Sequence, residues 1–424
     1  MKKNITIRNM GVDFTVYTLL CISLSAEAQQ ATFQGLGTLP TGGQSYAYTV
    51  SSDGTVVAGL ASDGMGFFLA MRWTEIDGMI NLGALPSPFS DSLISGASFD
   101  GSVLVGYSNT DIGGVAIRWT SEDGMVSLGR LTPTSVYSLA GDVSADGTIV
   151  VGFDEKPSFL REAFRWSSEE GMVGLGFPSG GASSWASGIS SDGSTIVGTS
   201  LSSLGQQAFR WTNEEGMIGL GDFSGGPFNS VALAASSDGS VVVGRGWTID
   251  DPEAMRWTMN GGMIGLGVLP GNDHGSVATS VSADGSIVVG HSNTNSSSES
   301  KAFIWDEVNG MRNLRSLLVN EYGLNLSGWL LTNAWDIDDD GLIIVGYGLN
   351  TAISSITPVA WMVRLPDSCA ADTDDSGAVN VTDLLELLAH WGLCPPPCPS
   401  DIIIDGAVNV MDLLELLESW GVCP

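Results

Sequence analysis

The stretch VSADGSIVVGHSNTNSSSESKAFIWDEVNGMRNL, residues 281–314, decides the fold of this chain. Its Asp284-Gly285 pair predicts a tight hairpin turn, because glycine accepts positive φ and aspartate tolerates the left-handed region. Alternating and β-branched runs flank that turn, and a second turn is expected at Gly310. The unit is therefore expected to supply four short strands and no helix, at residues 277–281, 287–289, 302–305 and 311–314.

The same phrase occurs seven times. Its Asp-Gly pairs are separated by intervals of 47, 46, 46, 46, 46 and 56 residues. Four-stranded units of this length in tandem are typical of β-propeller blades. We therefore expect an all-β, seven-bladed propeller built from repeats of about 46 residues. The pairs begin at Asp53, Asp100, Asp146, Asp192, Asp238, Asp284 and Asp340.

The two ends of the repeat region complement each other. The region starts with a segment that matches a fourth strand, Phe33 to Pro40, and stops after a third strand, Val359 to Val363. A ring that pairs these ends has seven complete blades. An open β-solenoid, which would need polar caps instead, is the alternative. The ten extra residues of the last interval, between Met311 and Asp340, fit an adjustment at ring closure or a ligand-binding loop.

The chain begins with the features of an export signal. Lys2 and Lys3 precede an apolar stretch, 14–24, and Ala26-Glu27-Ala28 is a small-x-small cleavage site. We therefore divide the chain into a signal peptide (1–28), a propeller (29–366) and a tail (367–424). No later stretch is long enough for a transmembrane helix. We expect a soluble protein, secreted by a bacterium or held at its cell surface.

The chain is strongly acidic, with 47 Asp and Glu against 16 Lys and Arg and a net charge of −31. Such a surface repels phosphate backbones, so nucleic acid is not an expected partner. It keeps a secreted protein in solution and is compatible with binding of divalent cations.

The tail is a duplicated loop-helix module, because the segment from Asp372 to Gly392 returns 29 residues later as Asp401 to Gly421. The first loop has the spacing of a calcium loop, with side-chain oxygens at positions 1, 3, 5, 9 and 12. Calcium prefers six to eight oxygen ligands, and Gly377 at position 6 permits the sharp turn that directs them inward. The expected ligands are Asp372, Asp374, Ser376, the Ala378 carbonyl, Asn380 and Asp383.

The second loop lacks one of these ligands, because Ile403 occupies position 3. We expect weaker calcium binding there, or a loop held mainly by packing and a disulfide. Its expected ligands are Asp401, Asp405, the Ala407 carbonyl, Asn409 and Asp412. Four cysteines flank the two copies, and they allow three connectivities. Pairing within each copy is the most economical: Cys369 with Cys394, and Cys398 with Cys423.

The tail resembles a type I dockerin from Cys369 to Cys423, through its two Gly-x-Val-Asn loops and Leu-Leu-x-Leu-Leu helices. Known dockerins bind a β-sandwich partner, the cohesin, and attach secreted proteins, often polysaccharide-degrading enzymes, to a scaffold. The resemblance implies a calcium-dependent, EF-hand-type module that docks on a cohesin-like or other envelope or extracellular protein. It implies these recognition positions: Val381, Thr382, Val410 and Met411.

The repeat region, 31 to about 365, is similar to the HAF-type bacterial extracellular repeat. The similarity is carried by Ala208-Phe209-Arg210-Trp211-Thr212 and Ser282-Ala283-Asp284-Gly285. It implies an exported repeat protein and brings no defined activity.

Catalytic motifs are scarce. The three histidines fall in different units, and neither Gly-x-Ser-x-Gly nor His-Glu-x-x-His occurs. Residues that recur from unit to unit are expected to be scaffold: the Asp of every unit as part of a turn, and the Arg that precedes the Trp in five units as a brace to a carboxylate. A site should use residues that break the repeat, namely Arg245, Trp247, Asn272, Asp273, His274 and His291.

Among these, Trp247, Asp273 and His274 are the candidate ligand-binding residues, because a sugar stacks on Trp and forms hydrogen bonds with polar neighbours. Ordinary loop variation is the alternative. We expect a secreted propeller that binds a glycan or protein ligand without catalysis and is attached through its dockerin-like tail. The alternatives are a polysaccharide-active enzyme, a hydrolase or lyase with its site at the channel mouth, and a structural envelope component. Acidic residues that break the repeat and meet on one face would favour the enzyme.

Overall fold

The computed structural model describes residues 30–424 with gaps. It contains two compact units, one of residues 30–366 and one that includes residues 367–424. No helix in the described part of the chain has the length and hydropathy that a membrane crossing requires. The residues outside the description are 1–29, 89–90, 272–273, 294–299, 353–355, 367–370, 372, 374–377, 380, 394–397, 399, 404–406 and 423–424.

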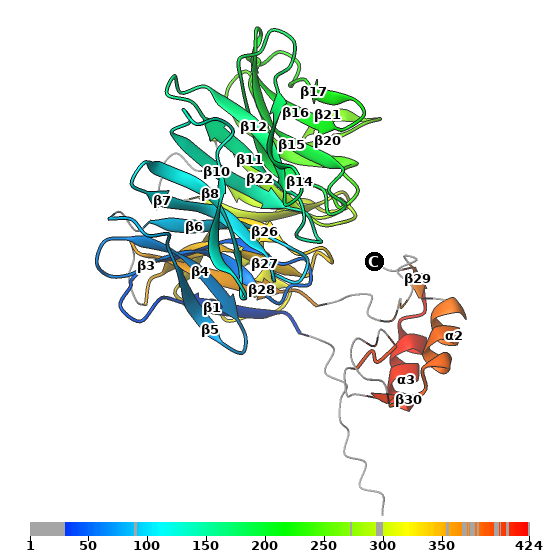
Figure 1. Cartoon of the computed structure of the whole chain (residues 1–424). Helices are drawn as coiled ribbons and strands as arrows, with labels where there is room; N and C mark the ends of the chain where they lie inside the picture. The colour runs from blue at the N-terminus through cyan, green and yellow to red at the C-terminus, as the bar shows by residue number, and fades with distance from the viewer. Residues whose placement is uncertain are drawn as a thin grey trace, which may run out of the picture. The chain divides into compact units, whose positions relative to one another are not determined.

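The compact unit of residues 30–366 is a ring of seven antiparallel four-stranded sheets, or blades (Figure 1). The prediction of four strands per repeat is confirmed. Blades 1 to 3 consist of β2 Ser45–Val50, β3 Val57–Ser62, β4 Phe68–Thr74 and β5 Gly78–Gly83; β6 Ser92–Ala97, β7 Leu104–Thr110, β8 Gly113–Thr120 and β9 Gly124–Gly129; β10 Tyr137–Val143, β11 Val150–Glu155, β12 Arg161–Ser167 and β13 Gly171–Gly176.

The remaining blades follow the same order, except that the last one takes its outer strand from the start of the chain. Blades 4 to 7 consist of β14 Ser183–Ile189, β15 Thr195–Ser202, β16 Gly205–Thr212 and β17 Gly216–Gly219; β18 Ser230–Ala235, β19 Val241–Trp247, β20 Pro252–Thr258 and β21 Gly262–Gly265; β22 Ser276–Val281, β23 Val288–Ser292, β24 Lys301–Asp306 and β25 Gly310–Asn313; β26 Trp329–Ile337, β27 Ile343–Asn350, β28 Pro358–Arg364 and β1 Thr32–Gly37.

The repeated Ser-x-Asp-Gly phrase forms the turn between the first and second strands of a blade. In blade 4, Ser190 Oγ donates to Asp192 Oδ1 at 2.6 Å and accepts from the Thr195 amide at 2.9 Å. Gly193 has a φ of 73°, a conformation in which a side chain would be strained. The motif recurs because it satisfies the polar groups of the turn by itself.

The ring closes by pairing the two ends of the repeat region. Strand β1 runs antiparallel to β28 as the outer strand of blade 7 (Figure 1). Ser45 Oγ then joins blade 1 to blade 7, donating to the Gly37 carbonyl at 2.6 Å and accepting from the Ala360 amide at 2.9 Å. At the turns, the Asp339 amide donates to the Ser52 carbonyl at 3.2 Å. Closure by the terminal strand is confirmed, and the open solenoid is wrong.

The core lies between neighbouring blades rather than within them. Between blades 3 and 4, for example, Val151 and Ala163 pack against Ile196 and Phe209. A similar cluster at the closing junction contains Leu36 from the start of the unit and residues of β28 from its end. Each blade therefore depends on both neighbours for burial of its apolar side chains.

The long last interval contains a helix, so the prediction of strands alone was wrong there. Helix α1, Leu314–Asn320, is capped by the Asn313 side chain, which accepts from the Ser316 amide. Its buried face, Leu314, Leu317 and Leu318, packs into the cluster between blades 6 and 7. The insertion thus fills the space between blades 6 and 7 with apolar side chains, next to the closing junction between blades 7 and 1.

In the tail, each of the helices α2 Val381–Ala389 and α3 Val410–Glu418 has one short strand before it and one after it. Strand β29 Ala378–Val379 pairs with β32 Gly421–Val422, and β30 Gly392–Leu393 pairs with β31 Ala407–Val408. Each copy therefore pairs its loop strand with the end of the other copy. The core between them consists of Ala371, Val379, Leu387, Val408 and Leu416.

Candidate functional site in the central channel

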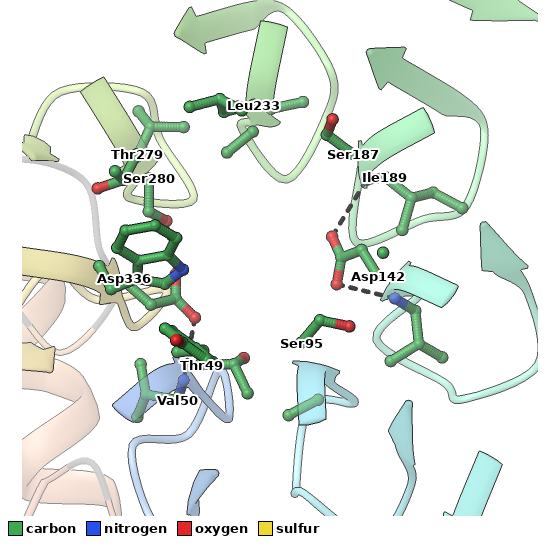
Figure 2. Close-up of a pocket in the computed structure, with 18 of the residues that line it drawn as sticks. Thr49, Val50, Ser95, Asp142, Ser187, Ile189, Leu233, Thr279, Ser280 and Asp336 are labelled. Carbon is green, nitrogen blue, oxygen red and sulfur yellow. Dashed lines mark hydrogen bonds between the residues drawn. The ribbon is translucent and has the colours of Figure 1, made fainter. Parts of the chain in front are cut away.

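A channel runs through the centre of the ring and contains a cavity of about 330 Å³. The first strands of all seven blades line it (Figure 2). All the Asp-Gly turns lie where the first strands end, so they share one end of the channel, the turn end. The opposite end, where the second strands finish, is called the mouth.

Each first strand contains a β-bulge at the same place, five residues before the Asp of its turn. A bulge redirects a side chain out of the regular alternation. Here it brings one residue per blade to the wall of the channel. These bulge residues are Tyr48, Ser95, Gly141, Ser187, Leu233, Thr279 and Trp335.

The next residue along each strand is small in five blades and an aspartate in two, Asp142 and Asp336. Figure 2 shows these two carboxylates on different sides of the channel. Neither aspartate was predicted from the sequence as a functional residue. The signal was available, because they are the only acidic residues at the position four before the Asp-Gly pair. The five small residues are Thr49, Gly96, Gly188, Ala234 and Ser280.

Asp142 joins blade 3 to blade 4. Its Oδ1 accepts from the Val143 amide at 2.8 Å, and its Oδ2 accepts from the Ile189 amide of the next blade at 3.1 Å. The residue is half-buried at the channel wall. Removal from bulk water raises the pKa of Asp142 to about 7, against the effect of the two amides, and the nearby Asp336 carboxylate adds to the rise.

Asp336 joins blade 7 to both neighbours. Its Oδ2 accepts from the Val50 amide of blade 1 at 2.9 Å, across the closing junction. Its Oδ1 accepts from Ser280 Oγ of blade 6 at 2.6 Å and from the Ile337 amide at 3.0 Å. Burial raises the pKa of this carboxyl as well. Both aspartates thus act as staples between blades.

Aromatic side chains gather at blades 7 and 1, and two of them, Tyr48 and Trp335, line the channel. We call Tyr46, Tyr48, Trp335 and Tyr347 the aromatic cluster. The ring centroids of Tyr46 and Tyr347 are 4.9 Å apart, those of Tyr48 and Trp335 5.3 Å, and those of Trp335 and Tyr347 6.1 Å. Burial raises the pKa of Tyr48, so its hydroxyl stays protonated at neutral pH. The cluster offers apolar ring surface with hydroxyl groups at its edge.

A second group of rings lies at blades 2 to 4. The Tyr107 and Phe153 rings flank Tyr137 at 5.8 and 5.9 Å. The Arg161 guanidinium lies over Phe153 at 4.6 Å and over Trp185 at 5.9 Å. Arg161 also pairs with Glu155 at 2.8 Å, so its charge is already balanced.

One row of mouth residues comes from equivalent positions on the second strands. Each pairs across its blade with a residue of the first strand. The row holds six residue types in seven blades, in contrast to the repeated turns. Its members are Leu60, Tyr107, Phe153, Thr199, Arg245, His291 and Tyr347.

The candidate residues Trp247, Asp273 and His274 form no site that the structure demonstrates. Trp247 ends β19 in blade 5, and its Nε1 is buried without a hydrogen-bond partner. His274 is exposed, with its Nδ1 3.7 Å from Asp251 Oδ1. Asp273 lies outside the described residues. Among the described residues, no ring contact or hydrogen bond joins Trp247 to His274.

The repeated Arg before Trp is a brace in three blades. Arg165 and Arg210 each pair at 3.0 Å with a glutamate of the following turn, and Arg72 pairs with Asp77 at 3.4 Å. In blade 5, Arg256 donates instead to the Gly285 carbonyl of the next blade. These contacts are largely exposed, so each contributes at most about 1 kcal/mol.

The first calcium loop falls mostly outside the described residues, which exclude Asp372, Asp374, Ser376 and Asn380. Ala378 is described as part of β29. Asp383 is fully buried at the start of α2, and its Oδ1 accepts from the Thr373 amide at 2.7 Å. The last acidic position of the loop therefore faces the loop's beginning, as calcium coordination would require.

The second loop is described except around Asp405. Asp412 is fully buried, and it accepts from the Ile403 and Asn409 amides at 3.0 and 2.7 Å. Asn409 Oδ1 accepts from the Met411 amide, and its Nδ2 donates to the Ala407 carbonyl at 2.9 Å. Two expected ligands thus have partners within the loop. No group of three or more acidic, His or Cys side chains suited to a metal occurs among the described residues.

The expected recognition residues begin the two tail helices. Val381 and Val410 are 58% and 57% exposed, Met411 is 38% exposed, and Thr382 is exposed. Of the cysteines, Cys398 is described and half-buried, whereas Cys369, Cys394 and Cys423 lie outside the described residues. Their pairing stays a prediction.

Comparison with known proteins finds similarity of fold. No family model matches the chain, and no curated protein matches it. An oligogalacturonate lyase from Vibrio parahaemolyticus is 10% identical, with 80% of this chain and 98% of that chain covered and a TM-score of 0.50. The β-propeller domain of the Trilobed protease from Pyrococcus furiosus is 11% identical (79% and 94% covered, TM-score 0.48), and TolB from Acinetobacter baumannii is 15% identical (60% and 62%, 0.42).

The chain thus spans less than two thirds of that TolB. At such identities the likeness supports the propeller fold alone. The HAF-type and dockerin resemblances stay predictions.

Proposed function

We propose that this protein is a secreted, non-catalytic binding protein whose propeller holds a glycan or protein ligand at the mouth of its channel. The aromatic cluster carries the proposal. It places the Trp335 and Tyr48 rings on the channel wall and keeps Tyr347 beside them. Aromatic faces with hydroxyl groups at their edge are suited to the apolar faces and hydroxyls of a sugar.

The contacts of the channel carboxylates favour binding over catalysis. Asp142 and Asp336 break the repeat, as catalytic acids should, but their oxygens accept from backbone amides of neighbouring blades. A general acid or base needs an oxygen directed at the substrate. These side chains instead hold the ring together.

The alternative is a polysaccharide-active enzyme with its site at the mouth. The raised pKa of Asp142, about 7, suits a proton donor near neutral pH and is the observation in its favour. Asp142→Asn separates the two functions. An enzyme would lose turnover while still binding, whereas a binding protein would show no turnover in either form.

The proposal is tested by titrating the full chain with a panel of neutral and acidic oligosaccharides in a calorimeter. Trp335→Ala should raise Kd at least about tenfold, equivalent to about 1.4 kcal/mol. Tyr322→Ala, an aromatic residue on the insertion that is 39% exposed, should leave Kd unchanged. The oligosaccharides are then analysed for cleavage. Cleavage products, or a Kd that ignores Trp335, would overturn the proposal.

We propose in addition that the tail docks the protein, in the presence of calcium, on a cohesin-like or other envelope or extracellular protein. Exposed apolar side chains on α2 and α3 support this. Leu385 and Leu388 are 62% and 49% exposed, and Leu414 and Leu417 are 48% and 50% exposed. An apolar strip of this kind on a small unit is suited to a protein partner.

The tail is tested by calcium titration of the full chain and by capture from the envelope and secretome with calcium or chelator. Asp374→Ala in loop one should weaken calcium binding more than Asp405→Ala in loop two. Capture should be lost with chelator and in a Val381→Asp, Val410→Asp double variant. Capture that ignores both would move the partner site to the propeller.

A further inference from the structure

Unsatisfied polar atoms concentrate in one sector of the mouth. Seven buried side-chain nitrogen or oxygen atoms among the described residues lack a hydrogen-bond partner. Five of them belong to the mouth end of blades 4, 5 and 6. Buried polar groups in native proteins are nearly always satisfied, so a local concentration of exceptions points to a missing ligand or water. The five atoms are Thr199 Oγ1, Asn229 Oδ1, Arg245 Nε, Trp247 Nε1 and His291 Nδ1.

Arg245 is the charged member of this group. Arg245 lies on β19, the second strand of blade 5, where its backbone is opposite Val231 and Ala254 of the flanking strands. Its buried Nε has no hydrogen-bond partner. The described residues offer it no ion pair or hydrogen bond, although the chain holds 47 Asp and Glu residues and five other arginines have a carboxylate partner. A shortage of acids is therefore not the reason why this guanidinium is unpaired. Its partial burial without a counter-charge costs stability.

His291 occupies the same position in the next blade. Its ring is parallel to that of Trp335, with centroids 6.4 Å apart and an interplanar angle of 3°, so it adjoins the aromatic cluster. Burial, followed by the charge of Arg245, lowers the pKa of His291 to about 4. The imidazole is neutral at pH 7, and it can donate one hydrogen bond from a ring nitrogen.

Resting on the proposed function, we infer that Arg245 and His291 form a subsite for the carboxylate of an acidic saccharide bound against Trp335. The guanidinium matches a planar carboxylate with two parallel N–H donors. The imidazole adds a third donor, and the adjoining rings supply the surface on which the sugar lies. The net negative charge of the chain does not prevent this, because repulsion from distant surface charges is largely screened at physiological salt.

The inference is tested with a matched pair of ligands, a glucuronate-containing oligosaccharide and the same oligosaccharide after reduction of its carboxyl groups. The full chain should bind the acidic form at least about tenfold more tightly, as expected for a charge-assisted hydrogen-bonded pair. Arg245→Gln should abolish that preference and leave the Kd for the reduced form within about twofold. Arg256→Gln, which removes the same charge from the same blade away from the mouth, should preserve the preference.

Folding is controlled by the free energy of unfolding, which Arg245→Gln should leave unchanged or raise because it removes an uncompensated charge. Arg245→Lys, which keeps the charge and loses the planar fork, should give an intermediate preference. Equal Kd values for the two ligands, or a preference that survives Arg245→Gln, would overturn the subsite while leaving the binding function intact. Failure of both ligands to bind in every form would instead contradict the glycan-binding function and the subsite with it.

Discussion

The two ends of the channel differ in how fully their polar groups are satisfied. At the turn end, Ser190 and Asp192 bond each other and the backbone, and the same pattern recurs in the first six blades. At the mouth, equivalent positions hold Thr199, Arg245 and His291, and each has a buried polar atom without a partner. The repeated turns satisfy their own polar groups, whereas three of the seven variable positions of the row do not. Natural proteins leave such groups unsatisfied chiefly where they function.

The largest effect is expected when the ring is opened, because the repeated architecture relies on closure between blades 7 and 1. Deleting residues 30–40 removes β1, the Gly37 acceptor of Ser45 and the apolar side chains of Leu36 and Leu39. We expect a loss of more than about 4 kcal/mol, measured by denaturant unfolding, because a whole junction is lost. Ser45→Ala, which removes only the hydroxyl bridge, should cost about 1 kcal/mol. Similar losses for both variants would mean that closure contributes little.

The two staples should differ in strength. Asp336→Ala leaves three donors without an acceptor, the Val50 and Ile337 amides and the Ser280 hydroxyl, so we expect a loss of about 2–3 kcal/mol. Asp142→Ala leaves two, and about 1–2 kcal/mol should be lost. Chemical denaturation at pH 7 compares them. A larger loss for Asp142→Ala would show that the junction between blades 3 and 4 depends more on its aspartate than the closing junction does.

The Asp142 staple should also make stability depend on pH. Its pKa is raised from 3.8 to about 7 in the folded state, so the native protein holds a proton between these values that the unfolded chain releases. The free energy of unfolding should therefore fall as pH rises from about 4 to 7, by about 1–2 kcal/mol after allowance for channel water. The turn carboxylate Asp146 has a lowered pKa and titrates below this window, whereas burial raises the pKa of Asp338, in the turn of blade 7, to about 7, so that it adds to the same fall.

Asp142→Asn should flatten that slope, which is measured as the difference between wild type and variant in denaturant midpoints from pH 4.5 to 7.5. Parallel curves for the two proteins would show that Asp142 is ionised throughout the range.

The smallest effects compare the two ends within one blade. Ser190→Ala at the turn end removes a hydroxyl that bonds Asp192 and the Thr195 amide, and it should cost about 1 kcal/mol. Thr199→Val at the mouth replaces an unpartnered hydroxyl by a methyl group and keeps the shape of the side chain. It should be neutral or stabilising. Thermal unfolding of both variants decides. Equal destabilisation would mean that Thr199 has a bound water that completes its contacts.

Much of the fold could be predicted because the repeat is local. The Asp-Gly turn and the Ser before it lie within a few residues, and they form the same structure in blades 1 to 6, whereas Asp338 replaces the Ser in blade 7. The helix at 314–320 could not be predicted in this way, since it breaks the repeat and depends on Leu314, Leu317 and Leu318 packing between two blades.

The candidate site was less predictable. Asp142 and Asp336 could have been found by aligning the repeats, but their role as staples could not, because each bonds residues of other blades 46 or more positions away. Arg245 and His291 were recognisable as departures from the pattern. Both lack hydrogen-bond partners because of the neighbouring groups that the closed ring places beside them. Sequence spacing does not reveal which groups these are.

By itself, the sequence determined the blade, the number of blades and the pairing of the two ends, because turn chemistry, strand period and repeat length act over short distances. The tertiary structure alone decided what faces the channel. There the bulges of seven strands turn their side chains toward one axis, so residues far apart in the chain share one space. The contacts made across that space distinguish the carboxylates that hold the ring together from the unpaired groups at its mouth.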